Sequence, residues 1–160
     1  MTLRFLIIFL SLFFTFGCAS TTTLPTGCTG KNVPPDAYSL WQKPPEEVHS
    51  ARAQEDAPMI KAATRFSVYL QQKDQDSSGF VQFTVSKDGD YYILSDFYPR
   101  MNVLDLADKN VSLTADAWGP VRGCSTMNKS LRFKLKANSN YALEIISRDS
   151  RKVNILILPL

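Results

Sequence analysis

Most of this chain alternates between apolar and polar residues with a period of two. The alternation begins after residue 64 and is clearest over 66–71 and 81–85, where phenylalanine, valine and leucine occupy every second position. Successive side chains of a strand point to opposite faces, so this period is typical of strands with one buried face. Comparable stretches follow at 91–94, 101–106, 111–113, 131–135, 141–146 and 153–158. The sequence therefore predicts about eight short strands over residues 64–160.

The residues between these stretches predict how the strands are connected. Asp88 and Gly89 predict a tight turn, because glycine readily adopts positive φ and aspartate tolerates it. The stretches 81–85 and 91–94 are therefore expected to form a hairpin. Many short strands with little helix between them favour an all-β fold, an antiparallel β-sandwich of jelly-roll type. A small eight-stranded barrel is the alternative.

The residues before the strands form three segments of different composition. Residues rich in threonine and proline favour extended backbone and predict a tether that packs locally through Tyr38, Leu40 and Trp41. Pro45 and the acidic Glu46 after it are typical of a first helical turn, so one short helix is expected there. The predicted organisation is a signal peptide (1–17), a tether (18–45), a short helix (46–63) and a β-sandwich domain (64–160).

The N-terminal segment has the features of an export signal. Arg4 provides a basic start, and residues 5–16 are apolar apart from one serine and one threonine. A helix of about twelve residues spans roughly 18 Å, whereas the hydrocarbon core of a bilayer is about 30 Å thick. The segment is therefore expected to be a signal-peptide hydrophobic region and not a transmembrane helix.

The apolar segment ends in Gly17 and Cys18, where a small residue precedes a cysteine at the expected cleavage point. In this respect the sequence resembles bacterial lipoprotein precursors, although Thr15 and Phe16 replace the leucine and the small residue usual in their motif. The resemblance implies that Cys18 becomes the N-terminus and carries diacylglycerol and palmitate chains. Each buried methylene contributes about 0.8 kcal/mol, so several chains anchor a protein stably. Alternatives are an uncleaved anchor and cleavage by an ordinary signal peptidase.

The same resemblance implies a cellular location. The residue after Cys18 is Ala19, not the aspartate that retains enteric lipoproteins at the inner membrane. The expected location is the bacterial outer membrane, with the lipid-anchored protein facing the periplasm.

Two further cysteines predict one disulfide bond. Once Cys18 is lipidated, Cys28 and Cys124 remain, and an oxidising compartment favours their pairing. The bond would close a loop of nearly a hundred residues, which the chain-entropy model values at roughly 4 to 5 kcal/mol. Two buried free thiols are the alternative.

The charge balance excludes one class of partner. The formal net charge is +3, and removal of Arg4 with the leader reduces it to +2. So small an excess of positive charge does not indicate a nucleic-acid-binding protein.

The sequence contains little that indicates catalysis. His49 is the only histidine and lies in a polar segment, so it is expected to be a solvated surface residue. No nucleophile elbow, zinc-binding helix, phosphate loop or dinucleotide loop is present. No cofactor, metal or catalytic residue is therefore assigned. Asp74, Asp76 and Ser78 match the first half of a calcium loop, but Val85 occupies the twelfth position. A polar hairpin loop is therefore expected, and a weak calcium site is the alternative.

Three cations are candidates for contact with an anionic partner. Arg132, Lys134 and Lys136 alternate with apolar residues and are expected to share one exposed strand face. Arg148, Arg151 and Lys152 could extend this patch, which could contact lipopolysaccharide phosphates, peptidoglycan carboxylates or an acidic envelope protein. Charges that only keep the sheet face soluble are the alternative.

A second resemblance concerns the strand-rich part. Residues 89–92 read Gly-Asp-Tyr-Tyr, a loop with a cysteine follows, and residues 140–145 read Asn-Tyr-Ala-Leu-Glu-Ile. The pattern resembles the jelly-roll domains of pre-peptidase C-terminal type, which implies a non-catalytic module. The expected function is that of a lipid-anchored envelope protein with a binding or assembly role. An envelope inhibitor of a hydrolase and a weak hydrolase using His49 are the alternatives.

Overall fold

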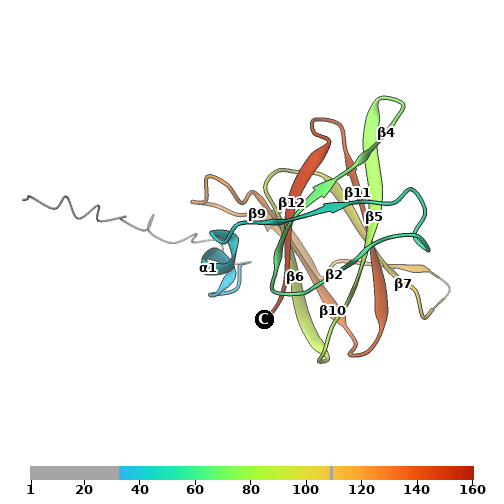
Figure 1. The fold of residues 1–160 in the computed structure, drawn as a ribbon. Helices are drawn as coiled ribbons and strands as arrows, with labels where there is room; N and C mark the ends of the chain where they lie inside the picture. The colour runs from blue at the N-terminus through green and yellow to red at the C-terminus, as the bar shows by residue number, and fades with distance from the viewer. Residues whose placement is uncertain (1–32, 109) are drawn as a thin grey trace, which may run out of the picture.

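The protein is a β-sandwich of two sheets (Figure 1). The structure, a computed structural model, describes residues 33–108 and 110–160. In the first sheet, sheet A, the order is β1 (Glu46–His49), β3 (Arg65–Tyr69), β12 (Lys152–Pro159), β6 (Gly89–Ser95), β10 (Lys129–Leu135) and β9 (Ala117–Pro120). In sheet B it is β2 (Met59–Ile60), β5 (Asp76–Thr84), β11 (Asn140–Ser147), β7 (Arg100–Asp105) and β8 (Val111–Leu113), and β4 (Gln71–Lys73) also pairs with β5. The predicted all-β sandwich is confirmed, but the described residues form twelve strands where about eight were expected. The sequence did not predict β1, β2, β4 and β9, which are all four residues long or shorter.

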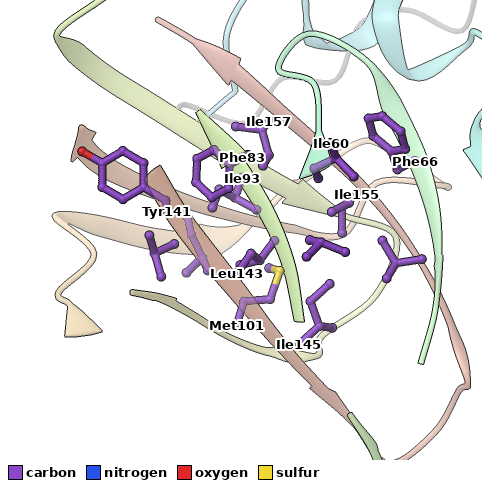
Figure 2. Close-up of a cluster of buried hydrophobic side chains, with 14 of the residues drawn as sticks. Ile60, Phe66, Phe83, Ile93, Met101, Tyr141, Leu143, Ile145, Ile155 and Ile157 are labelled. Carbon is purple, nitrogen blue, oxygen red and sulfur yellow. The ribbon is translucent and has the colours of Figure 1, made fainter. Parts of the chain in front are cut away.

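The main core fills the space between the two sheets. Alternate residues of each strand point inward, so the rings of Phe83 of β5 and Tyr141 of β11 pack together, tilted by 30° with their centroids 5.5 Å apart. Figure 2 shows how side chains from both sheets converge in this layer, and those it labels include Ile93, Leu143 and Ile155. All five side chains are at most 1% exposed, so each contributes roughly 1.5–3 kcal/mol of burial free energy.

A smaller core lies on the outer face of sheet A. The helix α1 (Ala37–Trp41) contacts β12 and covers apolar residues of sheet A, among them Leu94 and Leu156. Trp41 is 1% exposed, and Arg65 lies over its ring with the guanidinium carbon 4.6 Å from the centroid. The expected local packing through Trp41 is confirmed. No helix in the described part of the chain is long and apolar enough to cross a bilayer.

The short helix expected over residues 46–63 is wrong. Residues Glu46–His49 form β1, which runs parallel to β3, and Met59–Ile60 forms β2, which runs parallel to β5. Pairing with β3 places Val48 against the main core. A helix over the same residues would have had almost no apolar face to bury, so tertiary pairing determines the conformation here.

The hairpin expected around Asp88 and Gly89 is also wrong, although Gly89 has a φ of 155°. Strand β5 pairs with β11 in sheet B, whereas β6 pairs with β10 and β12 in sheet A. The turn therefore carries the chain from one sheet to the other. Asp88 also stabilises the connection between β10 and β11 by accepting a hydrogen bond from the backbone N–H of Ala137 at 2.6 Å.

A second crossing between the sheets depends on a glycine. Ser50 follows β1 in sheet A, and Ala51 exchanges two backbone hydrogen bonds with Phe80 of β5, of 3.1 and 2.8 Å. A side chain at Gly79 would overlap the hydroxyl of Ser50 and lie 2.5 Å from its Cβ. Close backbone approach therefore requires glycine at this position. The crossing brings Arg52 to the outer face of sheet B.

Candidate binding surfaces

An open groove crosses the outer face of sheet B. Its main hollow has a volume of about 720 Å³, and two adjoining hollows of about 290 and 420 Å³ share lining residues with it. Together the three hollows form what we call the groove. Its residues come from the β4–β5 hairpin, from β7 and β11, and from the segments beside them: Arg52, Gln71–Asp76, Ser78, Phe80, Tyr98, Arg100, Glu144 and Ile146–Asp149.

The strand register fixes the floor of the groove. Ser78 of β5 lies opposite Ile146 of β11, which lies opposite Arg100 of β7. The next row along the strands contains Phe80, Glu144 and Asn102. Tyr98 precedes β7 and lines the far hollow. Asp76 of β5 lines this far hollow as well, and four residues of a strand advance about 14 Å, so the floor from Phe80 to Asp76 measures roughly 14 Å.

Hydrogen bonds hold several planar polar groups along the groove. Asn102 donates from Nδ2 to Oε2 of Glu144 at 2.7 Å. On the β4 side, Arg52 donates from Nε to Oε1 of Gln71 at 2.9 Å, and Gln71 donates from Nε2 to the carbonyl of Ser50 at 2.7 Å. These side chains are ordered before any ligand arrives, which lowers the entropic cost of binding.

The charges of the groove are mixed in sign. Arg148 and Asp76 form an ion pair of 3.4 Å, but the Arg148 side chain is 84% exposed, so the pair contributes little to stability. Among the described residues, no hydrogen bond or ion pair engages the side-chain cations of Lys73 or Arg100. Two cations therefore face the groove with donors available to a ligand.

The three predicted contact cations lie on the opposite sheet. Leu131 and Phe133 of β10 point into the main core, so Arg132 and Lys134 point to the outer face of sheet A as expected. They differ in surroundings. Arg132 is half-buried, and its Nε has no hydrogen-bond partner among the described residues. Lys134 is exposed and lies opposite Asp90 of the neighbouring strand β6. Lys136 is exposed just beyond the strand. Their contact with an anionic partner stays a prediction.

The other basic residues do not extend this patch. Leu135 pairs with Gly89 at one end of β6, whereas Ile155 of β12 pairs with Ser95 at the other end. Lys136 and Lys152 therefore lie at opposite ends of the sandwich. The expected union of Arg132, Lys134 and Lys136 with Arg148, Arg151 and Lys152 is wrong. Strands β10 and β12 both run antiparallel to β6, so the residues that follow β10 and those that begin β12 lie at opposite ends.

His49 belongs to a small cluster on the first strands of sheet A. Its ring is exposed and stacks on Tyr69 with centroids 5.0 Å apart. The Tyr69 hydroxyl donates to Glu47 Oε1 at 2.7 Å, and this bond, assisted by the nearby Lys152, lowers the pKa of Glu47. Contact with Tyr69, and then Glu47, raises the pKa of Lys152. The expected exposure of His49 is confirmed.

A half-buried carboxylate links the end of β6 to β12 on the same face. Asp96 accepts hydrogen bonds from the backbone N–H of Asn154 at 3.1 Å and from its side-chain amide at 2.7 Å. Ser67 donates to the other side-chain atom of Asn154 at 2.5 Å. Burial raises the pKa of Asp96 even though these bonds oppose the shift. The cluster is filled by its own hydrogen bonds, which indicates a structural role.

The predicted lipidation and disulfide residues are only partly described. Cys18 and Cys28 lie outside the described residues. Cys124 is half-buried in the connection between β9 and β10 and packs against the smaller core. The lipidation of Cys18 and the pairing of Cys28 with Cys124 therefore stay predictions.

The half calcium loop is part of a hairpin. Lys73 pairs with Asp76 across the turn between β4 and β5, and Asp74 occupies that turn with a φ of 53°. Within residues 33–108 and 110–160 no group of three side chains is placed to hold a metal ion. The expected polar hairpin is confirmed.

Comparison with known proteins gives a structural likeness and no family. No known protein family matches the chain, and no curated protein matches it in sequence. Among solved structures, the pre-peptidase C-terminal domain of collagenase from Bacillus anthracis is similar, with a TM-score of 0.38 and 12% identity. The likeness covers 72% of this chain and 97% of that domain.

The sequence analysis missed the groove. Arg100, Glu144 and Ser78 are far apart in the chain and become neighbours only through the pairing of β7, β11 and β5. The alternation of 101–106 and 141–146 could have indicated which of their residues face outward. It could not indicate that these two strands lie side by side.

Proposed function

We propose that this protein is a lipid-anchored component of the bacterial envelope that binds another envelope component through the groove on sheet B. The proposed anchor is Cys18, supported by the short apolar leader and the Gly17-Cys18 junction. The proposed location is the periplasmic side of the outer membrane. A bond between Cys28 and Cys124 would fix the chain near the anchor to the folded body, because Cys124 packs against the smaller core.

The groove is the observation that carries the binding role. Its main hollow of about 720 Å³ lies within the size range of ligand sites. Ordered polar groups such as Glu144 converge on it, and Lys73 and Arg100 offer donors that no described residue engages. A sheet face evolved only for solubility has no need of a hollow with ordered polar walls.

Filling the groove tests the proposal. Ser78 is half-buried on the groove floor, so Ser78→Trp should block it. Ser112 of β8 is exposed on the same sheet face beside Leu104 and away from the groove lining, so Ser112→Trp is a matched control. The mature protein is mixed with detergent-washed envelopes, and the fraction that sediments with them is measured. Detergent removes the membrane lipids, so the lipid anchor does not contribute to this binding. The proposal predicts loss of sedimentation with Ser78→Trp alone. Equal sedimentation of both variants and the parent protein would refute it.

A further inference from the structure

We infer that the groove takes a glycan that carries isolated carboxylate groups. This inference rests on the proposed binding function and names the ligand class of the same site. It follows from three features of the groove: an elongated floor with flat rings at both ends, ordered polar forks along its sides, and cations whose donors are available.

The floor suits an extended chain of linked rings. It measures roughly 14 Å along β5 from Phe80 to Asp76, which lines the far hollow together with Tyr98. Phe80 is half-buried at one end, and Tyr98 is 61% exposed at the other. An exposed aromatic ring stacks favourably on the apolar face of a sugar while its edge stays hydrated. The two rings would contact sugar units at opposite ends of the groove.

The sides of the groove fit hydroxyl groups. Asn102 holds one carboxylate oxygen of Glu144, which leaves the other oxygen to accept from a ligand. Arg52 fixes the orientation of the Gln71 amide by donating a hydrogen bond to its side-chain oxygen. A hydroxyl both donates and accepts, so planar groups fixed in orientation can bind neighbouring hydroxyls of one sugar. Groups already ordered bind with a smaller entropic cost than mobile ones.

The cations add a preference for carboxylates. Lys73 and Arg100 are not engaged by any described residue, and the guanidinium of Arg100 can bind a carboxylate through two parallel hydrogen bonds. A dense polyanion fits less well, because Asp74, Asp76 and Glu144 also line the main hollow and would repel it. Single carboxylates spaced along a glycan can contact the cations and avoid the acids.

A matched pair of sugars tests the inference. The probes are a hyaluronan oligosaccharide, which carries a carboxylate on every second sugar, and its methyl-esterified form, in which the same carboxyl groups are uncharged. Calorimetric titration of the mature lipidated protein in detergent micelles should show the acid form binding about tenfold more tightly than the ester, as expected for one charge-assisted hydrogen-bonded pair. Equal affinity for both forms, or binding of neither, would overturn the inference.

Variants assign the two effects to residues. Arg100→Gln should remove the preference for the acid form, so that the acid and the ester bind with the same affinity. Tyr98→Ala should weaken both forms alike, because stacking does not depend on the charge. Lys134→Gln, an exposed cation on the opposite sheet, is the control and should change neither affinity. If the preference for the acid form survives Arg100→Gln but disappears with Lys134→Gln, the ligand binds on sheet A and the inference about the groove is overturned.

The outcome separates this inference from the proposed function. If neither sugar binds but Ser78→Trp still abolishes sedimentation with envelopes, the groove binds another ligand and only the glycan assignment fails. If Ser78→Trp leaves sedimentation unchanged, the binding role of the groove itself fails.

Discussion

The contact between Gly79 and Ser50 allows a sharp test of how the two sheets are joined. In Gly79→Ala the new methyl group would lie 2.5 Å from the Cβ of Ser50 and 3.2 Å from the carbonyl oxygen of Ala51. Neither atom is the end of a flexible side chain, so backbone must move. The hydrogen bond from Ser50 Oγ to the carbonyl of Tyr69, 2.9 Å long, would be strained as well.

The magnitude follows from two terms. Overpacking of a close contact costs about 1–3 kcal/mol, and loss of a hydrogen bond costs about 1 kcal/mol. Gly79→Ala should therefore reduce the free energy of unfolding by roughly 2–4 kcal/mol. For a body of this size, each kcal/mol lowers the melting temperature by roughly 3–5 °C. Chemical denaturation followed by circular dichroism measures the change.

Substitutions at Ser50 supply the control. Ser50→Ala keeps the Cβ that causes the overlap, so adding Gly79→Ala to it should remain strongly destabilising. Ser50→Gly removes that atom, and Gly79→Ala should then cost less than about 1 kcal/mol, which would appear as coupling in a double-mutant cycle. If Gly79→Ala costs the same in both backgrounds, the reasoning from close approach is refuted.

Two further predictions concern stability, and a third concerns the disulfide bond. Burial raises the pKa of Asp96 above its ordinary value of 3.8, so the folded protein should lose stability as the pH rises from below that value through the raised pKa. Asp96→Asn should remove this pH-dependent component, as measured by denaturation curves at several pH values. Identical pH profiles for the variant and the parent protein would contradict the prediction. Trp41→Ala should reduce the free energy of unfolding by about 3–5 kcal/mol, because Trp41 is part of the smaller core and only 1% exposed. A reduction below about 1 kcal/mol would show that α1 does not pack there. Alkylation of the denatured mature protein should label Cys28 and Cys124 only after reduction, and labelling before reduction would exclude the bond.

The side chains of the core could be predicted because the period of two is a local property. Residues 131–135 are an example, since Leu131, Phe133 and Leu135 all point into the main core as the alternation requires. Strand β1 escaped prediction for the same reason. Its residues Glu46, Glu47 and His49 are exposed and only Val48 is partly buried, so this edge strand has no apolar alternation to detect.

The assignment of strands to sheets could not be predicted, because it depends on contacts between residues distant in sequence. Asp88 and Gly89 have the composition of a hairpin turn, yet the chain changes sheets there. The groove follows the same principle. Ser78 and Glu144 share its floor only because β5 and β11 pair in one particular register, and shifting that register by one residue would turn these side chains to the other face.

The central claim, a binding domain held at the membrane by a lipidated cysteine, is tested most directly by the mass of the N-terminal peptide. The protein is purified from the envelope fraction of cells that express the full chain, digested, and measured by mass spectrometry. The account predicts a peptide that begins at Cys18 and carries the mass of the attached acyl chains. An unmodified Cys18, whether inside an intact leader or in a product that starts at another residue, would contradict it.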